Sequence, residues 1–290
     1  MLTNNKHKKA FHSFLFIFPS IVGVAFFSII PIAYSIYISL SNSKSSTISI
    51  ENYVKLLNDD VYITTLLNSL KFVSIIVPII LVSSIFISAL LFQMQNNKLR
   101  NVLISIFYLP CITSPVAYSL FFKQLAYSDG LLSNIIKSIT NSDEAFNILQ
   151  NELGAKIYIS LICVWAWSGF YIIILFSAME NIDPNIYIAA KLDGAKAIRI
   201  FRIIILPIVR PVLILITLLA VCSTFQLYVE ISLLTKGGPG VSTYTLSYYL
   251  YRKTFTYVAD YGYSSAIGVS ILLINAFFSI IVLKIRQGKE

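Results

Sequence analysis

The first long apolar stretch of the chain is "FLFIFPSIVGVAFFSIIPIAYSIYISL", which runs from Phe14 to Leu40 without a charged residue. About 20 apolar residues in a helix are enough to cross the hydrocarbon core of a bilayer. Further long, predominantly apolar runs follow, so we expect an all-α polytopic membrane protein with six transmembrane helices. The predicted spans are residues 14–40, 70–91, 102–122, 157–179, 203–228 and 264–283.

The composition of the chain supports a membrane protein. Of its 290 residues, 57% are hydrophobic and only 12% are charged, whereas soluble domains carry about 25% charged residues. A cleaved signal peptide is the alternative for the first stretch. Its apolar region is about 7–15 residues long, which is shorter than 14–40, so we expect this stretch to remain as a span.

Lysine and arginine are distributed unevenly between the alternate segments that join the predicted spans. One set of segments holds the entire net charge of +9, and positive loops mark the cytoplasmic face. We therefore expect a multi-pass protein of the bacterial plasma membrane with both termini in the cytoplasm. The basic residues assigned to that face are Lys6, Lys8, Lys9, Lys98, Arg100, Lys191, Lys196, Arg199, Arg202, Arg210, Lys284, Arg286 and Lys289.

Residues that carry catalysis or bind metals and nucleotides are scarce. The two histidines lie at the N-terminus, and the three cysteines, at 111, 163 and 222, have no metal-ligand spacing. The sequence has no G-x-x-x-x-G-K-[ST] motif to hold ATP phosphates, and the predicted spans have no carboxylate in their central parts. We expect no catalytic residue, no metal, no cofactor in this chain and no nucleic-acid partner.

The stretch "YIAAKLDGAKAIRIFRIIILPIVRP", from Tyr187 to Pro211, places basic and small residues between two apolar runs. On one continuous helix, Ala190, Gly194 and Ala197 would share a face that a partner could approach closely. The alternative is that one short helix ends here and another begins. These residues alone leave both interpretations open.

This stretch resembles the EAA loop of binding-protein-dependent ABC importer permeases, most closely the sugar-importing, maltose-type branch. The matching residues are Ala189, Ala190, Gly194, Ile204, Leu206 and Pro207. Ile188 stands where the family usually has a glutamate. Other segments are similar to the family in the same order, including "ENYVKLLND" from Glu51 and "LLTKGGPGVSTYTLSYYLYRKTF" from Leu233.

The resemblance implies a type I ABC importer permease fold, as a single transmembrane domain over residues 1–290 with a cytoplasmic coupling loop over 180–202. It also implies a second homologous permease subunit, two ABC ATPase subunits that bind ATP and Mg²⁺, and an extracellular solute-binding protein. The loop would fit a cleft of an ATPase subunit. The residues implied for this coupling are Ala189, Ala190, Lys191, Asp193, Gly194 and Ala195.

For the solute, the resemblance implies a sugar, such as an oligosaccharide. Polar and aromatic side chains within spans could line its path, or they could simply pack the helices together. Those candidates are Trp165, Trp167, Tyr171, Thr224 and Gln226. The "GGPG" segment at 237–240 is either a structural turn or a contact for the binding protein.

Three other functions remain open. The chain could be a permease of the same type for glycerol-3-phosphate or another polyol-type solute. It could be an ATP-independent facilitator, or a membrane scaffold whose cytosolic helix binds a partner without transport.

Overall fold

The computed structural model describes residues 14, 16–41, 48–127, 130, 147–256 and 260–287. Within these ranges the regular elements are helices, with one isolated β-bridge between Ser41 and Ile48. The chain divides into two compact units, residues 60–249 with 271–290 and residues 1–59 with 250–270. Lys6, Lys8, Lys9 and Lys289, which we assigned to the cytoplasmic face, lie outside the described residues.

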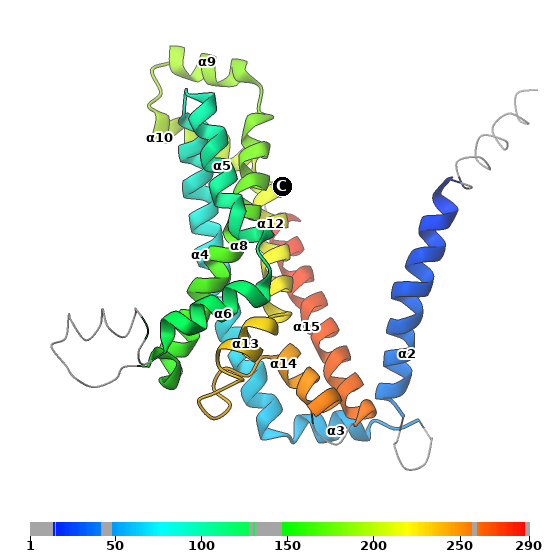
Figure 1. Ribbon diagram of the computed structural model, residues 1–290. Coiled ribbons are helices and arrows are strands. Elements are labelled where there is room, and N and C mark those ends of the chain that lie inside the picture. Colours follow the sequence, from blue (N-terminus) through cyan, green and yellow to red (C-terminus); the bar gives the residue numbers. More distant parts are fainter. Residues whose placement is uncertain are drawn as a thin grey trace, which may run out of the picture. The chain divides into compact units, whose positions relative to one another are not determined.

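The larger unit is built around three long helices that lie side by side (Figure 1), α4 (Asp60–Gln93), α8 (Glu152–Glu180) and α12 (Arg210–Phe225). A fourth helix, α5 (Asn97–Ile112), packs against α8. Leu91, Ile172 and Phe176 form a buried cluster where α4, α5 and α8 meet. The hydroxyl of Ser88 donates to the carbonyl oxygen of Ile172 at 2.9 Å, which adds a polar contact between α4 and α8.

Helices α5 and α8 approach each other closely at Gly169. A Cβ atom at this position would lie 2.0 Å from the carbonyl oxygen of Phe107. Small residues at such crossings let helix backbones pack tightly within a membrane. Gly169 therefore permits the spacing that brings the α5 and α8 side chains together.

The third predicted span, 102–122, is not one straight helix. Helix α5 ends at Ile112, and α6 (Pro115–Ala126) leaves at an angle of 90°. Thr113 and Ser114 have ψ values of 136° and 130°, and for Ser114 this is expected because the residue before a proline is disfavoured in the helical region. The predicted span 102–122 is therefore interrupted by a sharp bend, and the pair is either one broken span or a re-entrant loop.

The fifth predicted span also differs in its bounds. Residues 197–208 form the short elements α10 (Ala197–Ile200), η3 (Phe201–Ile205) and α11 (Leu206–Ile208). Helix α12 then starts after a break at Val209, and α13 (Val229–Leu234) follows it. Pro207 and Pro211 lack the N–H that would continue a helical ladder. The apolar segment long enough to span is accordingly Arg210–Leu234 rather than 203–228.

Five segments among the described residues are long and apolar enough to cross a bilayer, and the bent α5–α6 pair could be a sixth. Their lengths fit the approximately 30 Å hydrocarbon core at 1.5 Å per residue. The five are Phe16–Ser39, Asp60–Gln93, Glu152–Glu180, Arg210–Leu234 and Tyr261–Lys284.

Helix α4 begins at Asp60, before its predicted span, and polar side chains near the predicted start find partners elsewhere in the chain. The amide of Asn68 donates to the carbonyl oxygen of Val241 at 3.0 Å. The backbone N–H of Leu246, at the start of α14 (Leu246–Tyr251), donates to Ser69 Oγ at 3.0 Å. These contacts tether α4 to the segment that contains "GGPG". Within that segment, the N–H of Gly238 donates to the Thr235 carbonyl at 3.0 Å, which is a turn contact.

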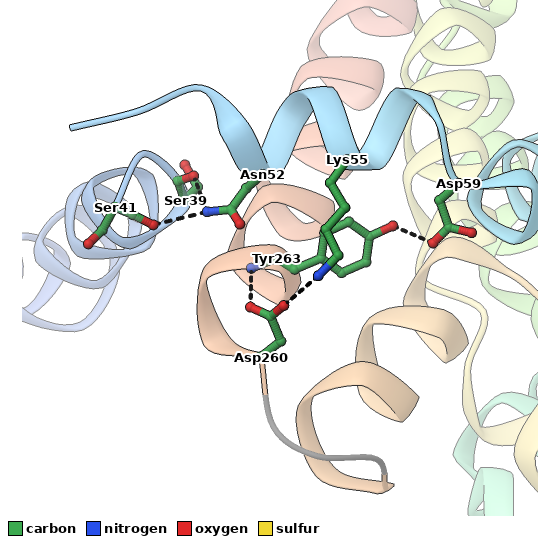
Figure 2. A network of polar contacts seen from close by, with 7 residues as sticks. All are labelled: Ser39, Ser41, Asn52, Lys55, Asp59, Asp260 and Tyr263. Atoms are coloured by element: carbon green, nitrogen blue, oxygen red, sulfur yellow. Dashed lines mark hydrogen bonds and ion pairs between the residues drawn. The ribbon is translucent and has the colours of Figure 1, made fainter. Parts of the chain in front are cut away.

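The smaller unit contains η1 (Ala25–Ile29), α2 (Ile30–Ser39), α3 (Glu51–Leu57), η4 (Arg252–Thr256) and the first part of α15 (Tyr261–Gln287). Figure 2 shows how Asn52 of α3 holds the end of α2. Its amide donates to the carbonyl oxygens of Ser39 and Ser41 at 3.0 and 3.1 Å. One side chain of α3 is thus bonded to the backbone at the end of α2.

A second polar contact set joins α3 to the start of α15 (Figure 2). Lys55 Nζ lies 2.8 Å from Asp260 Oδ2, and the Tyr263 hydroxyl donates to Asp59 at 2.5 Å. The backbone N–H of Tyr263 also donates to Asp260. Burial alone would raise the pKa of Asp260, but these bonds and the charges of Lys55 and Lys253 lower it overall.

Candidate functional site

The predicted coupling loop begins with a short, capped helix. Helix α9 (Pro184–Leu192) starts after Asp183, whose side chain accepts from the N–H of Asn185 at 2.9 Å. A proline at the first helical position suits this start, because its missing N–H would have no intrahelical partner. The sequence "DP" therefore sets where the helix begins.

The same helix ends at a left-handed glycine. Gly194 has a φ of +75°, and the N–H groups of Gly194 and Ala195 donate to the carbonyls of Lys191 and Ala190, both at 3.0 Å. This pair of bonds is a Schellman motif, in which glycine is favoured because it lacks a Cβ. The chain then restarts as α10 at Ala197, so of the two interpretations left open by the sequence, the structure shows the one in which a short helix ends and another begins.

The exposed surface of α9 also differs from the predicted small-residue face. Ala190 is only 8% exposed and packs within the chain. Ala189, Lys191, Asp193 and Gly194 are exposed, and Ala195 is half-buried. The two most exposed large apolar side chains of α9 are Ile188, at 55% exposed, and Leu192, at 84% exposed. These two residues lie four apart, on one side of the helix.

Beneath α9 lies a cavity of about 470 Å³, which we call the loop cavity. The Phe92 and Tyr187 rings meet at its wall, with centroids 5.3 Å apart. Burial raises the pKa of the Tyr187 phenol above its ordinary value. The lining residues are Ala89, Phe92, Gln93, Met94, Gln95, Tyr187, Lys191, Ala195, Ala197, Ile200, Phe201 and Ile205.

A second cavity, of about 300 Å³, lies between α5, α8 and α12, and we call it the aromatic pocket. It includes two of the five predicted solute-path residues, Trp167 and Tyr171. Tyr171 also interacts with the side chain of Ser223 from α12. The pocket is lined by Tyr108, Cys111, Ala166, Trp167, Phe170, Tyr171, Leu219 and Ser223.

The other three predicted solute-path residues do not line this pocket. Trp165 packs against Phe122, with ring centroids 5.3 Å apart. The buried hydroxyl of Thr224 donates to the carbonyl of Ala220 in its own helix at 2.7 Å. Gln226 is the exposed residue that follows the last residue of α12.

Sequence reasoning missed part of the aromatic pocket because its members come from separate helices. Tyr108, Leu219 and Ser223 carry no local pattern that marks them as a group. It also missed the pairing of Tyr118 in α6 with Glu230 in α13, where the phenol donates to the carboxylate. Both side chains are 4% exposed.

Among the described residues, no three His, Cys, Asp or Glu side chains are placed to hold a metal ion.

Comparison with known proteins agrees with this architecture. Lactose transport system permease protein LacF of Rhizobium radiobacter is 32% identical over 275 residues, covering 92% of this chain and 91% of LacF. Trehalose/maltose transport system permease protein MalF of Thermococcus litoralis is 28% identical over 292 residues, covering 98% of this chain and 97% of MalF.

A solved structure shows the same fold. A chain of a bacterial ABC transporter involved in the import of the acidic polysaccharide alginate aligns with a TM-score of 0.85 at 19% identity, covering 100% of both chains. The expected all-α polytopic fold of an ABC importer permease is thus confirmed. Residues 61–289 match the sequence model of one family. The chain belongs to that family, the binding-protein-dependent transport system inner membrane components.

Proposed function

We propose that this chain is a permease subunit of a bacterial ABC importer that takes up an oligosaccharide or similar sugar by ATP-driven alternating access. The relatives LacF and MalF are named for lactose and for trehalose and maltose. The related structure belongs to a transporter that imports alginate. These names favour a carbohydrate over a polyol phosphate.

The observation that carries the proposal is the aromatic pocket. Sugars bind through flat apolar faces that pack on aromatic rings and hydroxyls that need hydrogen-bond partners. Trp167, Phe170 and Tyr171 of α8 offer the rings. Ser223, together with the hydroxyls of Tyr108 and Tyr171, offers polar groups on the same lining. A volume of about 300 Å³ is at the small end for ligand sites, so it would hold one sugar unit of a longer solute.

The coupling role is assigned to α9 and the turn after it. Ile188 and Leu192 form an exposed apolar pair on a short helix with polar and charged neighbours. An exposed apolar pair of this kind suits a protein partner better than water. Because Ile188 stands where the EAA loop that this segment resembles has a glutamate, we propose that the contact with an ATPase subunit is apolar at this position.

The partners follow from the family. We infer a second homologous permease, two ATPase subunits that hold ATP and Mg²⁺, and an extracellular binding protein. In this arrangement ATP hydrolysis takes place outside this chain. We also infer that both termini and the 180–202 loop face the cytoplasm, since the lysine and arginine excess lies on that side of the predicted topology.

Reconstitution tests the proposal directly. The chain would be assembled in proteoliposomes with the permease, ATPase and binding-protein subunits encoded beside it, and uptake of labelled lactose, maltose, trehalose and glycerol-3-phosphate would be measured. We expect uptake of a sugar that requires both ATP and the binding protein. Uptake of glycerol-3-phosphate alone would reject the sugar assignment. Flux through vesicles that hold this chain alone would reject coupling and favour a facilitator.

A further inference from the structure

The loop cavity is a site that the proposed function leaves without an occupant. It lies beneath α9, at the end of the bundle formed by α4, α5 and α8 (Figure 1). Its lining has an apolar part, which includes Phe92 of α4 and Ile205 of η3, and a polar part made by Gln93, Gln95 and Lys191. Such a lining suits a ligand that is itself apolar at one end and polar at the other.

The charge at the polar end of the cavity is positive. Lys191 is the one charged residue among the described residues of the lining, and no described carboxylate forms an ion pair with it. The chain that follows adds the exposed residues Lys196, Arg199 and Arg202, whereas Asp193 is the one acid between Lys191 and Arg202. The polar end of the ligand is therefore expected to be anionic.

An exposed apolar face of α4 leads away from the cavity along the span. Ala89 and Gln93, four residues apart, both line the cavity. Phe86 and Val82 continue the same side of the helix at spacings of three and four residues. Their side chains are 64% and 68% exposed. The cavity is thus the end of a longer apolar surface on α4.

The length of this surface corresponds to half of a bilayer. Val82 and Gln93 are separated by 11 positions, which is about 16 Å at 1.5 Å per residue, and half of the hydrocarbon core is about 15 Å. The sequence agrees with this placement, because no charged residue occurs between Lys71 and Lys98 and the polar residues begin at Gln93. The cavity accordingly lies at the level of the lipid headgroups.

We propose that the loop cavity binds the headgroup of an anionic phospholipid, with one acyl chain of the lipid along Val82 and Phe86. Lys191 and the side-chain amides of Gln93 and Gln95 would donate to the phosphate. Basic pockets between transmembrane helices hold acidic headgroups by the same attraction. The lipid would lie beside the Phe92–Tyr187 ring contact, where α9 rests on α4. Its binding depends neither on the identity of the solute nor on coupling to an ATPase.

Lipid binding to the purified full-length chain tests the charge of the site. Native mass spectrometry would compare dioleoyl phosphatidylglycerol with dioleoyl phosphatidylcholine, which has the same chains but no net charge. We expect preferential binding of phosphatidylglycerol, weakened roughly fivefold by Lys191→Gln. Lys196→Gln is the matched control, since Lys196 is exposed on the same loop but does not line the cavity. Equal phosphatidylglycerol affinity in wild type and Lys191→Gln would overturn the proposal.

Two further arms test the cavity and the acyl chain. Ala89→Phe would fill the cavity from its wall without a change of charge, and it should lower phosphatidylglycerol binding. Unchanged binding in this variant would place the lipid elsewhere. Excess inorganic phosphate at constant ionic strength should not displace the lipid, because phosphate cannot bind the apolar face. Displacement by phosphate would show a site for free anions and would overturn the lipid assignment.

Photo-crosslinking in the assembled transporter distinguishes lipid from a protein neighbour on the same face. Benzoylphenylalanine would replace Phe86 in vesicles that contain both phospholipids. We expect adducts with the mass of a phospholipid, enriched in phosphatidylglycerol, and we expect Lys191→Gln to remove the enrichment. Adducts with the second permease alone would overturn the proposal. Because the readout is lipid rather than uptake, failure to transport a sugar would reject the proposed function and leave this result unaffected.

Discussion

The backbone N–H of Ala195 donates to the carbonyl oxygen of Ala190 at 3.0 Å, across a turn in which Gly194 has a φ of +75°. This bond ends α9 and directs the chain into α10 at Ala197. It also explains why the small residues of the loop do not form one docking surface. Ala190 is buried by the turn, and the side of α9 that carries Ile188 and Leu192 faces outward.

The first prediction concerns the conformation of Gly194. A Cβ atom at this position would meet no other atom within 4 Å, so space does not require a glycine here. The requirement comes from the positive φ, which strains the backbone of other residues. Gly194→Ala should cost about 1–2 kcal/mol of local stability and reduce ATP-driven uptake. Gly194→Asn should retain most activity, because asparagine enters the left-handed region more readily. Equal uptake by wild type and Gly194→Ala would show that the turn geometry is unimportant.

The second prediction concerns the apolar pair on α9. Leu192→Asp should leave the unfolding temperature of the chain nearly unchanged, since Leu192 is 84% exposed, and surface substitutions cost little. It should nevertheless abolish most of the stimulation of ATPase activity by the loaded binding protein. Leu192→Met, which keeps an apolar side chain, is the control and should behave like wild type. Normal stimulation in Leu192→Asp would remove this pair from the coupling contact.

The third prediction distinguishes the two tryptophans of α8. Trp167 lines the aromatic pocket, whereas Trp165 packs on Phe122 and Tyr118. Trp167→Phe should raise KM for the sugar several-fold, consistent with an aromatic contact of about 1 kcal/mol. Trp165→Phe should change KM little. A larger KM change in Trp165→Phe than in Trp167→Phe would place the solute elsewhere.

The fourth prediction concerns the close packing of α5 on α8. Gly169→Val would push side-chain atoms against the Phe107 backbone, because even a Cβ would lie 2.0 Å from its carbonyl oxygen. Overpacking of this kind costs roughly 1–3 kcal/mol, so we expect a lower yield of folded protein and a lower unfolding temperature. Gly268→Ala, in α15, is the control, since its Cβ would meet nothing within 4 Å. Equal thermal stability of both variants would contradict the close approach at Gly169.

The fifth prediction concerns pH. The pKa of Asp260 is lowered from the reference value of 3.8, so its pairing stabilises the folded smaller unit above that pH. The contribution is lost as pH falls through the lower pKa of the folded state. Lys55 is 56% exposed, so the contribution should stay below about 1 kcal/mol.

Thermal unfolding between pH 7 and pH 3 tests this expectation, with Asp260→Asn for comparison. We expect the wild type to lose its small advantage over Asp260→Asn only at the acidic end. An advantage that instead grows with acidification would contradict the sign of the pKa shift.

The sequence was sufficient for the helical class and for the family. Uncharged stretches such as 14–40 can satisfy their backbone in lipid only as helices. The sequence was insufficient where contacts between distant segments set the ends of the helices. Helix α4 extends back to Asp60, and within this extension Asn68 and Ser69 are bonded to a distant segment. No local pattern encodes those bonds.

The loop illustrates a different limit. Periodicity placed Ala190, Gly194 and Ala197 on one face, but a single glycine with a positive φ ended the helix between them. Glycine both fits a helix and ends one, so the sequence left the two outcomes open. In the solute path, residue type selected Trp167 and Tyr171, whereas Tyr108 and Ser223 emerged only when the three helices were brought together.

The central claim is that the outer side of α9 contacts the ATPase subunit, and site-specific photo-crosslinking tests it most directly. Benzoylphenylalanine would be placed at Leu192 in the assembled transporter, with Ile79, an exposed residue within the α4 span, as the control position. We predict that Leu192 crosslinks to the nucleotide-hydrolysing subunit with a yield that changes when ATP is added, and that Ile79 does not. Crosslinks from Leu192 to lipid alone, with or without ATP, would contradict the account.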